Sequence, residues 1–282
     1  MIAILSDIHA NLPALEAVLT DMPKVRSIWV LGDMVGEFPY PIEVLDRLMN
    51  LNVAAVAGNR ELDLLEMKRG GHADWFHKSQ FGCLAWTHDV LLPHHWAFLS
   101  SLEHPRTVSV GDHQAILAHG SPNRVRDHIF SLGQAKGLFD KYPQTLMATG
   151  HTHKIGYYLY EGKTFIGAGS VGLALDGIGG VAAYALYDEN TGKAAFRHVS
   201  YNVDKVIQDT KASDMYDRAP DFCNADILEL LTGRHHVLSL IDFVQGYAEK
   251  ALGEKECDIP DDIWREAAPL WDRKEWLKGR MR

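Results

Sequence analysis

The chain has 282 residues, of which 46% are hydrophobic and 23% charged, and its formal net charge is −9 with its 15 histidines neutral. This composition is ordinary for a globular protein that buries a sizeable core. An acidic chain is a poor general binder of nucleic acids, which require basic surfaces, so we expect no nucleic-acid polymer as a partner.

The first 60 residues alternate between short apolar runs and segments whose apolar residues recur at helical spacing. This alternation predicts parallel strands with helices on the faces of a sheet. Pro41 suits the first turn of the second helix. The expected strands lie at residues 1–5, 27–31 and 52–57, and the expected helices at 12–20 and 42–49.

Residues 61–101 are expected to form a mostly helical insert, after which strand patterns return. Several of these patterns flank turn residues such as Gly111-Asp112 and Glu161-Gly162, which predicts antiparallel pairing in the second half. Two mixed sheets, packed face to face and covered by helices, account for both halves. The later strands are expected at residues 106–110, 114–118, 145–149, 157–160, 163–166, 181–187 and 194–199.

The character of the chain changes at about Asn202, where strand patterns give way to helical ones. We therefore expect a catalytic domain at residues 1–201 and a helical C-terminal extension at 202–282. Nothing in the sequence of the extension indicates its function. Its helices are expected at residues 203–212, 227–232, 237–252 and 262–278.

The three cysteines, Cys83, Cys223 and Cys257, are far apart and form no paired motif. They are typical of free thiols in a reducing compartment. No apolar stretch approaches the roughly 20 residues that cross a bilayer, and residues 2–5 are expected to be a strand rather than part of a signal peptide. We therefore expect a cytoplasmic protein with no membrane partner.

A small polar cluster follows each of five expected strands. Taken singly, each cluster has an ordinary structural explanation, such as helix capping by Asp7 or Asn11, or a turn at a Gly-Asp pair. Taken together, the clusters meet at one edge, because ligands of α/β sheets bind outside the carboxyl ends of the strands. Carboxylate, amide and imidazole groups suit borderline divalent metals, and seven such groups suffice for two ions. The candidate ligands are Asp7, His9, Asp33, Asn59, His119, His151 and His153.

The ordered motifs resemble those of the calcineurin-like metallophosphoesterases. They are Asp7-x-His9, Gly32-Asp33-x-x-Gly36, Gly58-Asn59, His119 and Gly150-His151-x-His153. The runs 118–122 and 169–172 are similar to the small bacterial and archaeal phosphodiesterase branch, which includes asymmetric diadenosine tetraphosphate hydrolases. The resemblance implies a four-layer α/β/β/α sandwich of two mixed sheets. It covers residues 1 to about 200 and leaves the extension unexplained.

The resemblance also implies how two divalent metal ions would be held. One ion would be bound by Asp7, His9, Asp33 and His153, and the other by Asp33, Asn59, His119 and His151, with Asp33 as the bridge. Manganese or iron is the usual metal in such proteins, and zinc or magnesium is the alternative. A bridging hydroxide would attack phosphorus in line with the leaving oxygen.

One position departs from the commonest pattern of the family, in which a histidine that assists the leaving group follows the asparagine. Here Arg60 follows Asn59. Arginine is a poor acid near neutral pH, but it binds phosphate oxygens in a bidentate manner. We therefore expect Asp33, Asn59, Arg60 and His119 to act in catalysis, Arg60 and Arg124 to contact substrate, and leaving groups of low pKa to react best.

The expected substrate is a small phosphorylated molecule, a nucleotide phosphodiester or phosphoanhydride. Four aromatic residues of the insert either stack on a base or belong to the core, namely Trp75, Phe76, Phe81 and Trp86. If a separate acid exists, the histidines of the insert (72, 77 and 88) are the candidates, although ordinary surface histidines are the simpler interpretation.

Two other functions use the same fold. A phosphoprotein phosphatase needs the same metals but an open, shallow site, whereas the insert and the C-terminal helices are expected to wall a pocket. A non-catalytic interaction protein would tend to lose metal ligands, and here all seven candidates are present. The sequence also leaves open a homodimer, because two-fold dimers are the commonest oligomers.

Overall fold

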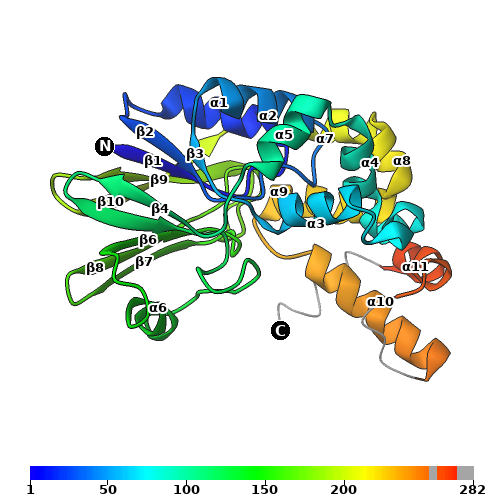
Figure 1. Ribbon diagram of the computed structural model, residues 1–282. Coiled ribbons are helices and arrows are strands. Elements are labelled where there is room, and N and C mark those ends of the chain that lie inside the picture. Colours follow the sequence, from blue (N-terminus) through cyan, green and yellow to red (C-terminus); the bar gives the residue numbers. More distant parts are fainter. Residues whose placement is uncertain (254–258, 272–282) are drawn as a thin grey trace.

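The computed structural model describes residues 1–253 and 259–271 and contains two five-stranded mixed sheets (Figure 1). In the first sheet β1, β2 and β3 are parallel and β9 and β10 add antiparallel pairs at one side, whereas in the second sheet three parallel strands lie between two antiparallel edge strands. The first sheet has the order β10 (Lys193–Ser200), β9 (Val181–Asp188), β1 (Ile2–Leu5), β2 (Ser27–Val30) and β3 (Ala54–Ala55). The second has the order β4 (Arg106–Val110), β5 (His113–Leu117), β6 (Leu146–Thr149), β8 (Lys163–Ala168) and β7 (Ile155–Tyr160).

Alternation along the strands divides the core into layers. Ile2 and Ile4 face the second sheet, whereas Ala3 and Leu5 face α1 (Leu12–Asp21) and α2 (Pro41–Asn50) on the other side. The outer face of the second sheet is covered by α6 (Leu132–Phe139). The result is helix, sheet, sheet, helix, as Figure 1 shows, and the predicted four-layer sandwich is confirmed. Such layering follows because each sheet must bury both faces.

The insert is helical, as predicted, and begins directly at the metal-site edge. Its first helix, α3 (Asn59–Lys68), starts at a candidate ligand. Trp75 stacks on Phe81, with 4.0 Å between the ring centroids, so these aromatics pack on one another within the insert. The other elements are two 3₁₀ helices (Ala73–His77 and Ser79–Phe81), α4 (Gly82–Val90) and α5 (Pro93–Ser100).

A helical C-terminal region is present, but its details differ from those expected. The predicted helix at 262–278 is shorter: α11 (Asp261–Ala267) ends in a 3₁₀ turn (Ala268–Leu270), and residues 272–278 lie outside the described residues. The helix predicted at 227–232 begins earlier, because Pro220 starts it and its polar first turns hid it from an apolar pattern. Its other helices are α7 (Val203–Lys211), α8 (Asp214–Arg218), α9 (Pro220–Thr232) and α10 (Val237–Leu252).

Within the described parts of the chain, no helix combines the length and the apolar character needed to cross a bilayer. The thiols of Cys83 and Cys223 are both free, and their sulfur atoms lie 3.7 Å apart where α4 meets α9. Cys257 lies outside the described residues. The insert and the extension are therefore packed against each other at this contact.

The segment after β8 returns from the second sheet to the first and holds the end of β1. Backbone N–H groups of Val171 and Gly172 donate to the carbonyl oxygens of Ser6 and Asp7, both at 2.9 Å. The Ser170 hydroxyl donates to the same Asp7 carbonyl at 2.7 Å. These bonds fix the backbone of a candidate metal ligand from the opposite sheet.

We predict that Gly172→Ala destabilises the protein, whereas Gly246→Ala in α10 does not. A Cβ at Gly172 would lie 1.9 Å from the Ile8 carbonyl oxygen, and a backbone atom cannot move aside cheaply. The expected loss is about 1–3 kcal/mol or more in free energy of unfolding. Gly246 has open space around it, so alanine should stabilise its helix by up to about 1 kcal/mol. Urea unfolding of both variants checks this, and equal behaviour would contradict it.

Candidate metal centre

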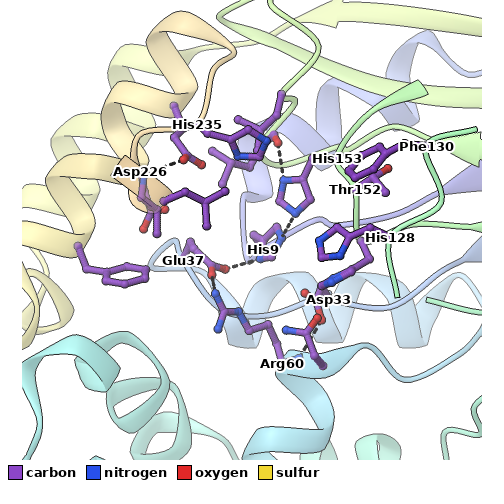
Figure 2. A pocket seen from close by; sticks show the side chains of 18 residues that line it. His9, Asp33, Glu37, Arg60, His128, Phe130, Thr152, His153, Asp226 and His235 are labelled. Atoms are coloured by element: carbon purple, nitrogen blue, oxygen red, sulfur yellow. Dashed lines mark hydrogen bonds and ion pairs between the residues drawn. The ribbon is translucent and has the colours of Figure 1, made fainter. Parts of the chain in front are cut away.

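Seven side chains converge where β1, β2, β3, β5 and β6 end, and a turn follows each strand. Figure 2 labels His9, Asp33 and His153 among them, on the wall of one cavity. Asp7, His9, Asp33, Asn59 and His119 are each at most 4% exposed. The two remaining candidates, His151 and His153, are partly exposed at the mouth. The structure thus brings together all seven predicted candidate ligands, and their roles as ligands stay a prediction.

The first ligand group contains Asp7, His9 and His153. The Nε2 atoms of His9 and His153 are 3.0 Å apart. Asp7 Oδ1 lies 3.4 Å from His153 Nε2 and 3.9 Å from His9 Nε2. Their donor atoms all lie within 4.8 Å of one another, which is close enough to bind one ion.

The second ligand group contains Asp33, His119 and His151, with Asn59 beside them. His119 Nε2 lies 3.3 Å from Asp33 Oδ2, 3.2 Å from His151 Nδ1 and 3.1 Å from Asn59 Oδ1. It is also 3.8 Å from Asp7 Oδ1 of the first group. The two groups are therefore adjacent, as a two-ion centre requires.

The tautomers of two histidines show that the site fits a cation. The Nδ1 atoms of His119 and His153 lie 2.7 Å from the carbonyl oxygens of Leu31 and Leu173. A carbonyl oxygen can only accept, so each Nδ1 carries a hydrogen and Nε2 is the ring atom that faces the site. Once these Nε2 atoms have lost their protons, their lone pairs face carboxylate, amide and imidazole acceptors, and a bound cation supplies the positive charge that offsets the repulsion.

The backbone at the ligands is unusual. Asp7, His9, Asp33, His151 and His153 all have φ between 48° and 67°, in the left-handed region that non-glycine residues rarely adopt. Such conformations cost free energy and persist only where the surroundings enforce them, which is typical of functional sites. The turns are therefore shaped to aim side chains at one point.

Both buried carboxylates are ionised at neutral pH, as metal ligands must be. Burial alone would raise the pKa of Asp7, but the nearby His153 and His119 outweigh it and lower the pKa to about 2. Burial acts the same way on Asp33, and His119 and His9 hold its pKa far below the usual range. Conversely, Asp33 and Asp7 outweigh burial and raise the pKa of His119 to about 9, so in the metal-free protein the ring keeps a proton at neutral pH, which a bound cation would displace.

Glu61, in the first turn of α3, accepts hydrogen bonds from two loops. Its carboxylate accepts backbone N–H bonds from Gly58 at 2.7 Å, Asp33 at 2.9 Å and Met34 at 2.8 Å. The side chain is fully buried. It therefore ties the turn after β2 to the start of α3, and so fixes two ligand-bearing loops relative to each other.

Glu37 is a functional residue that the sequence analysis missed. Its buried carboxylate lies between His9 Nδ1 and the guanidinium of Arg60. Charges of Glu37 and Asp33 hold the pKa of Arg60 above its ordinary value against the effect of burial, so Arg60 stays charged. The backbone N–H of Arg60 donates to Asp33 Oδ1 at 2.8 Å. Arg60 is thus bound to the centre from both ends.

The predicted substrate contact Arg124 lies on an exposed loop and is not among the described residues that line the cavity over the metal groups. Its neighbour Arg126 instead binds Asp63, with one nitrogen 2.6 and 2.7 Å from the two carboxylate oxygens. Contact of Arg124 with substrate therefore stays a prediction.

A cavity of about 450 Å³ lies over the two ligand groups, and part of its wall comes from the extension (Figure 2). The prediction that C-terminal helices wall a pocket is thus confirmed, although the individual residues were not foreseen. They carry no motif and lie 69 or more positions beyond His153, the last candidate ligand. They are Phe222, Asp226, Glu229, His235, Val237 and Leu238.

A third group with metal-ligand chemistry, Asp46, His94 and His95, lies apart from this cavity. His95 Nδ1 accepts the backbone N–H of Leu92 at 3.2 Å, so the hydrogen of the neutral ring is on Nε2. That Nε2 lies 3.0 Å from Asp46 Oδ1 and donates to it. His94 Nε2 lies 3.1 Å from the same oxygen, so hydrogen bonding within the three side chains accounts for this cluster without a metal.

Comparison with known proteins shows which family has a similar sequence and which solved structures have a similar fold. A model of the calcineurin-like phosphoesterase superfamily domain matches residues 1–192. An uncharacterized protein of Methanocaldococcus jannaschii is 29% identical over 235 residues, covering 74% of this chain and 90% of that protein. The crystal structure of a metallophosphoesterase from Sphaerobacter thermophilus matches with a TM-score of 0.68 and 28% identity, over 82% of this chain and 99% of that one. A hypothetical protein from Pyrococcus horikoshii OT3 shares the fold, with a TM-score of 0.67 and 20% identity over 83% and 100% of the chains.

We predict that Glu61→Gln lowers the free energy of unfolding by about 1–3 kcal/mol, because one side of the new amide would present N–H groups to backbone N–H donors. Glu66→Gln is the matched control, since Glu66 lies on the same helix and is exposed. It should change stability by no more than about 0.5 kcal/mol. Thermal or urea unfolding measures both, and an unchanged Glu61→Gln protein would contradict the role assigned to Glu61.

We predict that the metal-stripped protein binds two Mn²⁺ ions per chain, and that His9→Ala or His151→Ala removes one of them. Each substitution deletes a donor from a different ligand group. His113→Ala, an exposed histidine on β5, is the control and should leave both ions bound. Calorimetry with elemental analysis counts the ions, and a single ion in the wild type would overturn the two-ion assignment.

Proposed function

Because the chain belongs to the calcineurin-like phosphoesterase superfamily, we propose that it hydrolyses a phosphodiester or phosphoanhydride with two divalent metal ions. The observation that carries this proposal is the pair of adjacent ligand groups, Asp7/His9/His153 and Asp33/His119/His151. Manganese or iron is the metal we propose, because a set of carboxylate, amide and imidazole ligands suits borderline ions.

When bound, such ions lower the pKa of a water molecule and offset charge on phosphoryl oxygens. The protein's own contribution is to hold and orient the reacting groups. Arg60 has a buried Nε without a hydrogen-bond partner among the described residues, and this donor is free to bind an anionic oxygen of the substrate. Glu37 keeps the guanidinium aligned from the other side.

A second cavity, of about 360 Å³, supports a nucleotide as the substrate. It shares Glu37, Arg60, Phe222, Val237 and Leu238 with the cavity over the metal groups, so the two form one cleft. Its walls are mostly apolar and include aromatic side chains, on which a base can stack, while amide groups can bind the edge of the base. Those residues are Phe81, Phe222, Gln80 and Gln245.

The depth of this cleft disfavours a phosphoprotein phosphatase, which needs an open surface for a polypeptide. The insert supplies Phe81 and Leu84 to the walls, and the extension supplies Leu238 and Trp264. A small substrate can pass between these walls to the two ligand groups, whereas the walls would keep a folded phosphoprotein away from the ligand groups.

We predict Mn²⁺-dependent turnover of bis-p-nitrophenyl phosphate and diadenosine tetraphosphate by metal-stripped protein after add-back, with a phosphopeptide turned over more slowly. Asp33→Ala should reduce the rate by more than about 100-fold, because loss of outer groups around a metal already costs 10–100-fold. Asp217→Asn, an exposed substitution on α8, is the control for handling. No turnover of any substrate by protein with two ions bound would favour a non-catalytic binding protein instead.

A further inference from the structure

Hydrolysis of a phosphate ester leaves negative charge on the leaving oxygen, and a proton donor at that oxygen accelerates the step. In this cleft Arg60 cannot serve, because it stays charged beside Glu37 and Asp33. Glu37 cannot serve either, because its carboxylate is engaged between His9 Nδ1 and the guanidinium of Arg60. The donor must come from another wall of the cavity.

Asp226, on α9 of the extension, lines the same cavity as the metal groups. Figure 2 shows it on the wall opposite His128 and Phe130, on the side of Glu37. The side chain is only 1% exposed, and its Oδ2 atom has no hydrogen-bond partner among the described residues. A buried carboxyl group without a partner is costly unless a ligand completes its bonding.

The surroundings of Asp226 keep a proton on it. Burial, the charges of Glu37 and Glu229, and the thiol of Cys83 raise the pKa of Asp226 well above the ordinary value, and Arg60 opposes them. These groups come from the loop after β2, from α9 itself, from α4 and from α3. A protonated carboxyl is a hydrogen-bond donor, and this one faces a substrate cavity.

Two other side chains of the extension line the cavity and could donate a proton, Glu229 and His235, but neither suits the role. Glu229 Oε1 accepts backbone N–H bonds from His236 at 2.6 Å and Val237 at 2.8 Å, which commits its carboxylate to the start of α10. Burial and nearby positive charge lower the pKa of His235 to about 4, so its ring is neutral near pH 7 and has no acidic proton to give.

We propose that Asp226 is the general acid that protonates the leaving oxygen, a role that rests on the hydrolase function proposed above. As water adds to phosphorus, the bond from phosphorus to the leaving oxygen breaks and its electron pair stays on that oxygen. The oxygen takes the proton of the Asp226 carboxyl and leaves as an alcohol or phenol. Asp226 remains as a carboxylate, and bulk water returns its proton, matching the one released by the attacking water.

The test compares leaving groups rather than a single rate. Wild-type, Asp226→Asn and Asp217→Asn proteins, all loaded with Mn²⁺, are assayed for kcat/KM on a series of aryl phosphodiesters that differ only in the leaving phenol, from p-nitrophenyl to unsubstituted phenyl. Asparagine keeps the shape and a donor group but has no acidic proton. We expect Asp226→Asn to lose about 100-fold or more on the phenyl ester and far less on the p-nitrophenyl ester, whose leaving group needs little help. Asp217→Asn should match the wild type throughout.

An equal loss on every ester would overturn the acid role and assign Asp226 to binding or folding, while the hydrolase function would stand. The same leaving-group dependence in His128→Asn but not in Asp226→Asn would assign the acid to the opposite wall. Absence of wild-type turnover on all esters would overturn both the function and this inference.

Two further measurements do not depend on the variant's activity. In the wild type, kcat/KM for the phenyl ester should fall at high pH as the acid loses its proton, with no matching fall for the p-nitrophenyl ester. The infrared difference spectrum of wild type minus Asp226→Asn at neutral pH should show the carbonyl stretch of a protonated carboxyl group. A carboxylate band in its place would overturn the proposal even if the variant were poorly folded.

Discussion

The centre of this protein is a cluster of imidazole, carboxylate and amide groups packed so closely that a proton or a cation must lie among their lone pairs. His9 and His153 bring Nε2 atoms within 3.0 Å, and His119 Nε2 faces an amide, a carboxylate and another imidazole. Much of the surrounding structure holds this arrangement against repulsion. The ligand turns adopt left-handed backbone conformations, Glu61 ties two of the loops together, and the segment at Gly172 holds the end of β1. A bound cation turns the same repulsion into attraction, so the energy of folding and that of metal binding are linked.

The alternation of strands and helices and the two mixed sheets were predictable from apolar runs and turn residues, whereas the four-layer order was implied by the family resemblance. Residues 2–5 are apolar throughout, which predicts a buried strand but not that Ile2 and Ile4 face one core and Ala3 and Leu5 the other. What periodicity could not give was the extent of some elements. The third strand was expected at residues 52–57 but contains only Ala54–Ala55, because partner contacts decide where a ladder ends. The helix α6 and the first half of α9 were missed, since glycines and polar residues interrupt their apolar pattern.

The candidate ligands were predictable for a topological reason, since parallel strands deliver their carboxyl ends to one edge. Residues placed by tertiary packing were not. Glu37 and Glu61 look like surface acids in the sequence, yet both are buried, one between His9 and Arg60 and the other among backbone N–H groups. Asp226 gives even less warning, because its role depends on where a helix of the extension packs against the cavity. A buried acid is recognised from the residues packed around it, and these tertiary contacts cannot be identified from a single sequence.

The candidate metal ligands and the residues of the cleft walls come from different parts of the chain. Every candidate ligand lies at a strand end or at the first residue of α3, whereas the walls that meet the substrate come from the insert and from α9 to α11. Strand ends are fixed by two packed sheets, so changing them disturbs the core. The walls pack through smaller clusters, such as the one that joins Leu240, Val244 and Trp264. Substitutions there can reshape the cleft without moving a ligand. On the function proposed above, substrate choice and assistance to the leaving group would be properties of the insert and the extension, while the two sheets position the candidate metal ligands.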